Sequence, residues 1–173
     1  LLIIGGSLGA ASINQAIQQN LSAFEKMGLQ LIWQTGKPNA AMYKAAANAF
    51  GNVHVDSFIN DMSAAYAAAD MVVSRSGAMA VAEIAMTGKA CIFVPYPHAA
   101  EDHQTFNAEV LVKEKAAQMI ADKNVANELF PMIEKLIANK TVLSEMQTKI
   151  KSFAWENADQ VIAAEIIHEI DSK

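Results

Sequence analysis

The sequence predicts an α/β fold, a Rossmann-like doubly wound parallel sheet of six strands. Short apolar runs alternate with Ala-rich segments of helical periodicity, which is the order of βαβ units. The apolar runs are hydrophobic throughout instead of at every second position, as in strands that helices cover on both faces. Glycine or proline stands at several junctions, for example Gly88 and Pro95.

The elements follow from this alternation. The predicted strands are the short apolar runs at 1–4, 29–34, 53–55, 71–74, 90–94 and 117–120. The predicted helices cover 9–26, 39–50, 61–69, 77–87 and 101–115, followed by an all-helical part from 124 with a last helix over 155–170. Asp61 is the expected N-cap of its helix, Gly88 ends another, and Asn139 breaks the C-terminal helical part.

Composition excludes several classes of protein. The 173 residues suit one domain, and 53% hydrophobic with 18% charged residues supports a packed core. A net charge of −5 argues against binding to nucleic acid. The single cysteine, Cys91, excludes an internal disulfide and a cysteine-based zinc cluster. We expect no membrane span and no signal peptide, and the start inside a strand suggests a piece of a longer protein.

The loop after the first strand, Gly5-Gly6-Ser7-Leu8-Gly9, is the first candidate site, because ligands of such sheets bind beyond the strands' carboxyl ends. Its small residues let a phosphate approach a helix N-terminus, and Ser7 offers a hydroxyl. A plain tight turn is the alternative. Ser7 replaces the second glycine of the dinucleotide fingerprint and Gln34 stands near the place of its acidic residue, so NAD binding is not expected. The loop is not a P-loop either.

Two further strand-end loops offer the remaining parts of a nucleotide site. Gly77 and Ala78, after the fourth strand, leave a helix N-terminus open to an anion. Glu83 follows about one and a half turns later, where a carboxylate can accept both hydroxyl hydrogens of a ribose; a solvated helical Glu is the alternative. The segment 58–62 can hold a flat base against backbone groups, although an ordinary loop is the default.

The loop at 95–107, after the fifth strand, is rich in polar side chains. A metal site is not expected there, because His98 and His103 are five residues apart and helical ligand pairs need four. His103, Gln104 and Asn107 fit hydrogen bonding to a polyhydroxylated ligand instead. Helix capping is the other interpretation, by Glu101 or Asp102.

Together these segments resemble the C-terminal domain of the MurG family, the UDP-N-acetylglucosamine transferases of bacterial peptidoglycan synthesis. The resemblance covers roughly 1–120, in order and at the family's spacing. Its motifs are Gly5-Gly6-Ser7-Leu8-Gly9-Ala10 with Asn14, Gln34-Thr35-Gly36-Lys37, Phe58-Ile59-x-Asp61-Met62, Tyr66-x-x-Ala69-Asp70, Ser74-Arg75-Ser76-Gly77-Ala78, Glu83, Gly88, Val94-Pro95 and His103-Gln104-x-x-Asn107-Ala108.

The resemblance implies that 1–173 is the donor-binding half of a GT-B glycosyltransferase, with 124–173 as its helical end and the N-terminal acceptor domain missing. Ile59 is implied to meet uracil through its backbone, and Glu83 to hold the ribose. Other implied contacts to the diphosphate and sugar come from Gly6, Ser7, Ser76, Gly77, Ala78, Met79, His103, Gln104 and Asn107. Ala80 departs from the family, which often has Thr there, and removes one hydroxyl contact to phosphate.

The implied activity is an inverting hexosyl transfer without metal or cofactor. N-acetylglucosamine passes from UDP-N-acetylglucosamine to lipid-linked N-acetylmuramoyl-pentapeptide, at the cytoplasmic face of the bacterial plasma membrane. The catalytic base and the membrane contact are implied to lie in the missing domain, so this chain alone is expected to bind but not to turn over. In the family the last helix crosses back to that domain.

Alternatives from other classes stay open on the sequence. Another GT-B enzyme, such as a lipid galactosyltransferase or a UDP-N-acetylglucosamine 2-epimerase, uses the same donor loops. A non-catalytic UDP-sugar-binding domain is a further possibility. A nicotinamide oxidoreductase is disfavoured by Ser7 and Gln34.

Overall fold

The predicted parallel sheet is confirmed. The computed structural model describes residues 1–6 and 8–171, and these contain six strands that pair in the order β3-β2-β1-β4-β5-β6. All five pairings are parallel. The strands are β1 Leu2–Ile4, β2 Leu31–Gln34, β3 Val53–Asp56, β4 Met71–Ser74, β5 Ala90–Phe93 and β6 Gln118–Met119.

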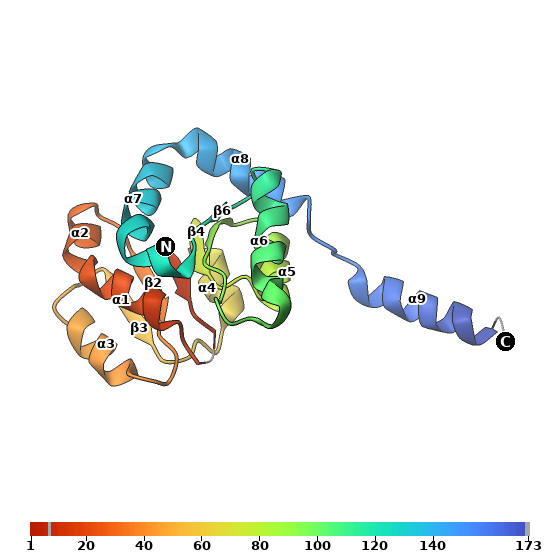
Figure 1. Cartoon of the computed structure of the whole chain (residues 1–173), viewed down its shortest axis with the longest axis horizontal. Helices are drawn as coiled ribbons and strands as arrows, with labels where there is room; N and C mark the ends of the chain where they lie inside the picture. Colours follow the sequence, from red (N-terminus) through yellow and green to blue (C-terminus); the bar gives the residue numbers. More distant parts are fainter. Residues whose placement is uncertain (7, 172–173) are drawn as a thin grey trace.

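Helices cover both faces of the sheet (Figure 1). They are α1 Ala11–Gln19, α2 Leu21–Lys26, α3 Ala40–Ala47, α4 Met62–Ala68, α5 Ala78–Thr87, α6 His103–Lys113, α7 Val125–Ala138, α8 Lys140–Lys151 and α9 Ala158–Asp171, with short 3₁₀ turns η1 Ala100–Asp102 and η2 Asp122–Asn124. Successive residues of β1 serve opposite faces. Ile3 packs in the cluster with α1, α2, α3 and α7, whereas Leu2 and Ile4 pack with α4, α5 and α6.

The predicted helix over 9–26 is wrong in two respects. Gly9 has φ +74°, a left-handed conformation outside the helix. The remainder divides at Asn20, whose side chain donates a hydrogen bond to the carbonyl oxygen of Ala16 at 2.8 Å. An asparagine amide that bonds to the backbone competes with the helical hydrogen-bond ladder, and the chain starts a new helix at Leu21.

The predicted helix over 101–115 begins later, at His103. Glu101 and Asp102 have φ +50° and +53°, so they form a left-handed turn instead of the first turn of the helix. Neither side chain caps the helix backbone, contrary to the alternative interpretation; Asp102 accepts a hydrogen bond from the Thr105 hydroxyl at 2.6 Å.

Three predicted helix boundaries are confirmed. The Asp61 carboxylate accepts the Ala64 N–H at 2.9 Å and caps α4. Gly88 ends α5 with φ +61°. Asn139 separates α7 from α8 and caps the latter through the Val142 N–H.

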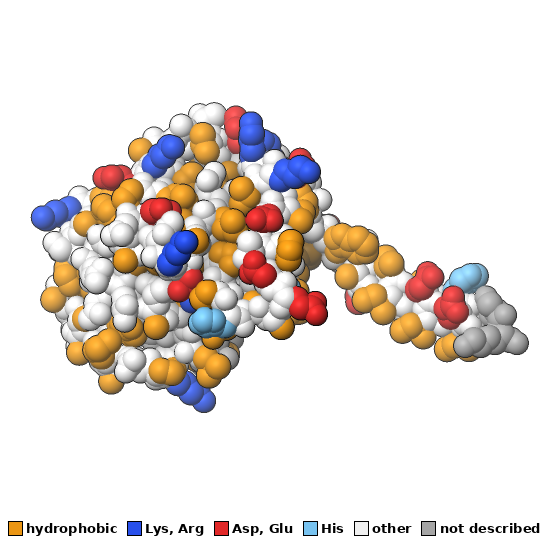
Figure 2. Space-filling view, in the orientation of Figure 1, with side chains coloured by type: hydrophobic (Ala, Val, Ile, Leu, Met, Phe, Trp, Pro, Cys, Tyr) orange, Lys and Arg blue, Asp and Glu red, His pale blue; other side chains and the backbone are white. Residues whose placement is uncertain are grey.

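The last helix, α9, begins at Ala158 and projects away from the sheet and its covering helices (Figure 1). Apolar side chains lie along it in the space-filling view (Figure 2). They are exposed: Trp155, just before the helix, is 72% accessible and Ile170 is 67% accessible. No helix within the described ranges has both the length and the apolar character needed to cross a bilayer.

Candidate functional site

A cleft of about 620 Å³ opens at the carboxyl ends of β1, β2 and β4. The strand order reverses between β1 and β4, which is where doubly wound sheets bind their ligands. Its volume lies within the usual range for small-molecule sites. The lining residues are Ile4, Gly5, Gly6, Leu8, Gly9, Gln34, Phe58, Ile59, Met62, Tyr66, Ser74, Arg75, Gly77, Met79, Ala80, Glu83, Tyr96 and Gln104.

Two helix N-termini meet at this cleft. Gly9 lies just before α1, and Gly77 is the residue before α5. Neither helix has a side chain that caps its first turn, and neither has an acidic residue there. The first-turn N–H groups therefore remain donors, and both positive dipole ends favour an anion between them.

Close backbone contact holds the loop after β1 against the loop after β2. Gly9 and Gly36 have φ +74° and +77°, and a Cβ on either would collide with backbone atoms of the other loop. Asn14 of α1 strengthens this contact, since its amide donates to the Thr35 carbonyl at 2.8 Å and accepts the Trp33 indole N–H at 2.9 Å. By contrast, Gly6 has φ +76° with open space beside it. Its backbone can therefore be approached by a ligand.

Gln34, at the end of β2, joins three loops. Its Oε1 accepts the Ile59 N–H at 2.9 Å, and its Nε2 donates to the Gly6 carbonyl at 3.3 Å. Sequence reasoning placed Gln34 in a family motif and used it to argue against an acidic ribose ligand, but assigned it no contact. In the structure its side-chain oxygen accepts the Ile59 N–H, so that N–H is not available to a ligand. The Ile59 carbonyl oxygen has no hydrogen bond to a described residue. Phe58, 49% accessible, adds an apolar surface beside that carbonyl.

Glu83 lies on the cleft wall, in the second turn of α5. Met79 and Ala80 are four and three residues earlier on the same helix face and line the cleft with it. The Tyr66 hydroxyl donates to Glu83 Oε2 at 3.1 Å. Burial raises the pKa of Tyr66 well above its usual value, and the neighbouring Glu83 carboxylate raises that pKa further. The phenol therefore stays protonated and remains a donor.

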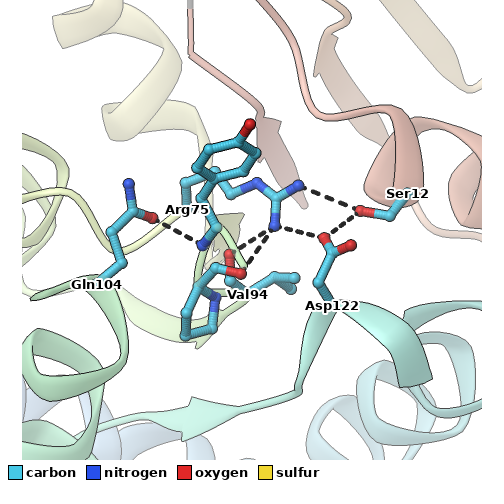
Figure 3. Close-up of polar contacts among 7 residues, drawn as sticks. Ser12, Arg75, Val94, Gln104 and Asp122 are labelled. Atoms are coloured by element: carbon cyan, nitrogen blue, oxygen red, sulfur yellow. Dashed lines mark hydrogen bonds and ion pairs between the residues drawn. The ribbon is translucent and has the colours of Figure 1, made fainter. Parts of the chain in front are cut away.

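Gln104 and Tyr96 are the residues of the polar 95–107 loop that line the cleft. Gln104 Oε1 accepts the backbone N–H of Tyr96 at 3.0 Å, as Figure 3 shows. Its Nε2 has no hydrogen bond to any residue within the described ranges, so one donor group is available at the cleft. The side-chain oxygen of Gln104 is therefore used inside the loop, and only its Nε2 remains for the hydroxylated ligand that the sequence predicted.

Four of the predicted site residues do not line the cleft: Ser76, Ala78, His103 and Asn107. Ser76 is fully buried and donates to the Gln104 carbonyl at 2.7 Å, while the Asn107 amide donates to the Ser76 carbonyl at 3.0 Å. Both therefore attach α6 to the loop after β4. His103 Nδ1 lies 2.7 Å from the Ala100 carbonyl oxygen. Ser7 is outside the described residues, and the other predicted residues, Gly6, Ile59, Gly77, Met79, Glu83 and Gln104, line the cleft.

An ion pair stands beside the cleft wall that contains Tyr96, and sequence reasoning missed it. Arg75 Nη1 lies 2.6 Å from Asp122 Oδ1 and donates to the carbonyl oxygens of Val94 and Pro95 at 3.1 and 3.0 Å (Figure 3). Its Nη2 donates to the Ser12 hydroxyl at 3.3 Å. The arginine thereby connects α1, the loops after β4 and β5, and η2. The motif around Arg75 was visible in the sequence, but its partner, 47 positions away, was not.

The cleft has few groups suited to acid–base or metal chemistry. Arg75 is paired with Asp122, and Glu83 accepts the Tyr66 hydroxyl. Among the residues that the structure describes, no three His, Cys, Asp or Glu side chains gather closely enough to hold a metal ion. Cys91 is fully buried and its pKa is raised by that burial, so it is not a nucleophile. The arrangement fits binding of an anionic, hydroxylated ligand.

The chain is similar to curated proteins that share one name. The transferase named UDP-N-acetylglucosamine–N-acetylmuramyl-(pentapeptide) pyrophosphoryl-undecaprenol N-acetylglucosamine transferase of Flavobacterium psychrophilum is 40% identical over 173 residues, 100% of this chain and 47% of that protein. The protein of the same name from Bacteroides fragilis is 43% identical over 96% of this chain and 45% of its own length. The chain thus spans about half the length of the curated relatives it matches.

Structure and family model agree with these relatives. The crystal structure of Acinetobacter baumannii MurG superposes with a TM-score of 0.83 at 34% identity, over 96% of this chain and 49% of that one. The fold is accordingly that of one half of a GT-B enzyme. The model of the glycosyltransferase family 28 C-terminal domain matches residues 1–162. The chain therefore belongs to the family of glycosyltransferase family 28 C-terminal domains.

Proposed function

We propose that this chain is the donor-binding half of a transferase that moves N-acetylglucosamine from UDP-N-acetylglucosamine to lipid-linked N-acetylmuramoyl-pentapeptide. The observation that carries the proposal is the pair of uncapped helix N-termini, of α1 and α5, on either side of one cleft that also contains Glu83. A diphosphate fits the two helix N-termini, and a ribose diol fits the Glu83 carboxylate. The relatives named above supply the identity of the sugar and of the acceptor.

The ligand would lie along the cleft from the loop after β3 to the loop after β5. The uracil meets Phe58 and the free carbonyl oxygen of Ile59, and the Glu83 carboxylate accepts the ribose hydroxyls. The diphosphate lies between Gly6 and Gly77, beside the first turns of the two helices. The sugar extends toward Gln104, whose Nε2 donates to one of its hydroxyls.

In the transfer, the acceptor hydroxyl oxygen forms a bond to the anomeric carbon as the bond from that carbon to the diphosphate oxygen breaks. UDP leaves with the bonding electron pair, and the helix N–H groups stabilise the growing charge. Ala80 adds no hydroxyl to this set, so backbone donors carry most of the interaction. A base must take the acceptor's proton. Glu83 and Arg75 are engaged elsewhere, so we place the base in the other half of the protein.

A second half of the protein also explains the exposed apolar side chains of α9. We propose that this helix packs against the acceptor-binding half, which also contacts the cytoplasmic face of the plasma membrane where the lipid-linked acceptor lies. This chain alone is then expected to bind the donor without transferring it.

Calorimetric titration of the chain with four ligands tests the proposal. UDP-N-acetylglucosamine and UDP should bind, UDP-galactose should bind more weakly than UDP-N-acetylglucosamine, and NAD should not bind. Binding of NAD in preference to UDP, or no binding of any uridine nucleotide, would contradict it.

A further inference from the structure

Tyr66 and Glu83 belong to different helices and meet at the edge of the cleft. The phenol oxygen of Tyr66, on α4, lies 3.1 Å from Oε2 of Glu83, on α5. Both residues line the cleft, but their environments differ. Tyr66 is 4% accessible, whereas Glu83 is an exposed residue. The buried hydroxyl therefore holds one end of an exposed carboxylate.

The position of the Tyr66 hydroxyl is fixed by packing. Its ring belongs to the buried cluster that contains Ile84 and Ala85 of α5 and Cys91 of β5. The helix that carries it is capped by Asp61. A tyrosine has two rotatable side-chain bonds, and this one is surrounded by core atoms, so its hydroxyl is a rigid donor.

Glu83 has no other restraint of this kind. It has three rotatable side-chain bonds, and its Oε1 has no hydrogen bond to another residue in the part of the chain that the structure describes. An exposed glutamate samples several rotamers and loses that freedom when a ligand orders it. A hydrogen bond that selects one rotamer before the ligand arrives reduces this cost.

We infer that Tyr66 is a positioning residue for nucleotide binding: its hydroxyl fixes Glu83 Oε2, so that the carboxylate is oriented for the ribose diol before the ligand binds. The inference rests on the proposed function, because it needs Glu83 to contact the ribose. It adds a residue buried in the core to the determinants of ribose recognition. The raised pKa of Tyr66 is consistent with a permanent donor.

A purely structural role predicts a different result. If the hydrogen bond only satisfies a buried hydroxyl, its removal changes the stability of the fold and affects all ligands of the cleft alike. If it orients Glu83, its removal affects only ligands with ribose hydroxyls, and only while Glu83 is present. Coupling between the two residues therefore separates the two roles.

The experiment is a calorimetric titration of the 173-residue chain with UDP and with 2′,3′-dideoxy-UDP, which lacks both ribose hydroxyls. The variants are Tyr66→Phe, Glu83→Ala and their combination. Tyr43→Phe is the matched control, since Tyr43 is also a buried tyrosine, 2% accessible, but packs against Trp33 in the cluster on the other face of the sheet. Thermal unfolding of each variant verifies that it is folded.

Tyr66→Phe should weaken UDP binding roughly 3- to 10-fold, the effect of one hydrogen bond. It should leave 2′,3′-dideoxy-UDP binding unchanged and add no loss in the Glu83→Ala background; Tyr43→Phe should change neither affinity. The inference is overturned if Glu83→Ala weakens UDP binding while Tyr66→Phe does not, or if Tyr66→Phe weakens both nucleotides equally. A wild-type chain that does not bind UDP, or a Glu83→Ala variant with full UDP affinity, overturns the proposed function and the inference with it.

If Tyr66→Phe does not fold, Glu83→Gln provides the second variant because it leaves the core intact. Its side-chain oxygen can still accept the Tyr66 hydroxyl, so it should retain more UDP affinity than Glu83→Ala. Equal UDP affinities of the two Glu83 variants would overturn the inference.

Discussion

Arg75 and Asp122 form an ion pair of 2.6 Å that joins the loop after β4 to the turn after β6. Their side chains are 15% and 22% accessible, so solvent screens the pair only in part. The same guanidinium donates to two carbonyl oxygens of the segment that follows β5. The wall of the cleft near Tyr96 therefore depends on a contact between residues that are far apart in the sequence.

Asp122→Ala should lower the free energy of unfolding by about 1–3 kcal/mol, because it leaves a half-buried guanidinium without its counter-ion. Urea unfolding measures this difference. Glu145→Ala, which removes an exposed acid that has no hydrogen bond among the described residues, is the control and should change the free energy by less than about 0.5 kcal/mol. Equal effects of the two variants would show that the ion pair does not stabilise the fold.

Gly36→Ala should destabilise the chain by more than the strain of its backbone conformation alone. Gly36 and Gly28 have similar φ values, +77° and +69°, but a Cβ at Gly36 meets the backbone of Leu8 and Gly9, whereas at Gly28 it meets open space. Gly28→Ala should therefore cost about 1–2 kcal/mol, the left-handed penalty, and Gly36→Ala should cost more. Denaturant unfolding of both variants gives the comparison. A smaller loss at Gly36 than at Gly28 would contradict the close approach of the two loops.

Glu83→Ala should weaken UDP binding by about 1–3 kcal/mol, the range for a hydrogen bond to a charged group. The fold should lose little stability, because the residue is exposed on its helix. Calorimetry with UDP, together with a thermal unfolding curve, separates the two effects. Unchanged UDP affinity would return Glu83 to the role of a solvated surface residue.

Gln104→Ala should weaken binding of UDP-N-acetylglucosamine more than binding of UDP, since we propose that its Nε2, which has no hydrogen bond to a described residue, donates to the sugar. Removal of the side chain also releases the Tyr96 N–H. Tyr96→Ala disturbs the same loop but keeps Gln104, so it is the control. It should change the affinities for UDP and for UDP-N-acetylglucosamine by the same factor. Equal losses of affinity for UDP and UDP-N-acetylglucosamine in Gln104→Ala would show that Gln104 does not contact the sugar.

Alkaline pH should destabilise the fold through Tyr66. Because its folded pKa is raised above the ordinary value of about 10, the unfolded chain loses the phenolic proton first as the pH rises. The stabilisation is complete below pH 10 and is lost progressively above it. Urea unfolding at pH 9 and pH 11 should show a smaller decrease for Tyr66→Phe than for the wild type. Identical decreases would contradict a buried, protonated phenol.

The sheet could be predicted from the sequence because its strands are short apolar runs, and the cleft followed because strand ends determine where ligands bind. The position of the first loop's glycines and of Glu83 at this cleft followed in the same way, because they stand after β1 and β4. The helix boundaries at Asn20 and Asp102 could not be predicted, since they depend on a side-chain hydrogen bond and on two left-handed residues.

The supporting residues of the site were the other omission. Gln34, Tyr66 and Arg75 bond to partners 17 to 63 positions away, and no local pattern indicates such pairs. Asn107 and Ser76 were expected to contact the ligand because of their local sequence. They lie in loops rich in polar residues, but their hydrogen bonds are used to attach one loop to another.

The cleft at the carboxyl ends of β1 and β4 should bind a UDP-sugar. Titration of the ¹⁵N-labelled chain with UDP-N-acetylglucosamine, followed by amide chemical shifts, locates the binding surface. The largest changes should fall on Gly6, Ile59, the first turn of α5 and Glu83, with the remote surface around Thr148 unaffected. Changes centred on that remote surface, or no changes at saturating ligand, would contradict the account.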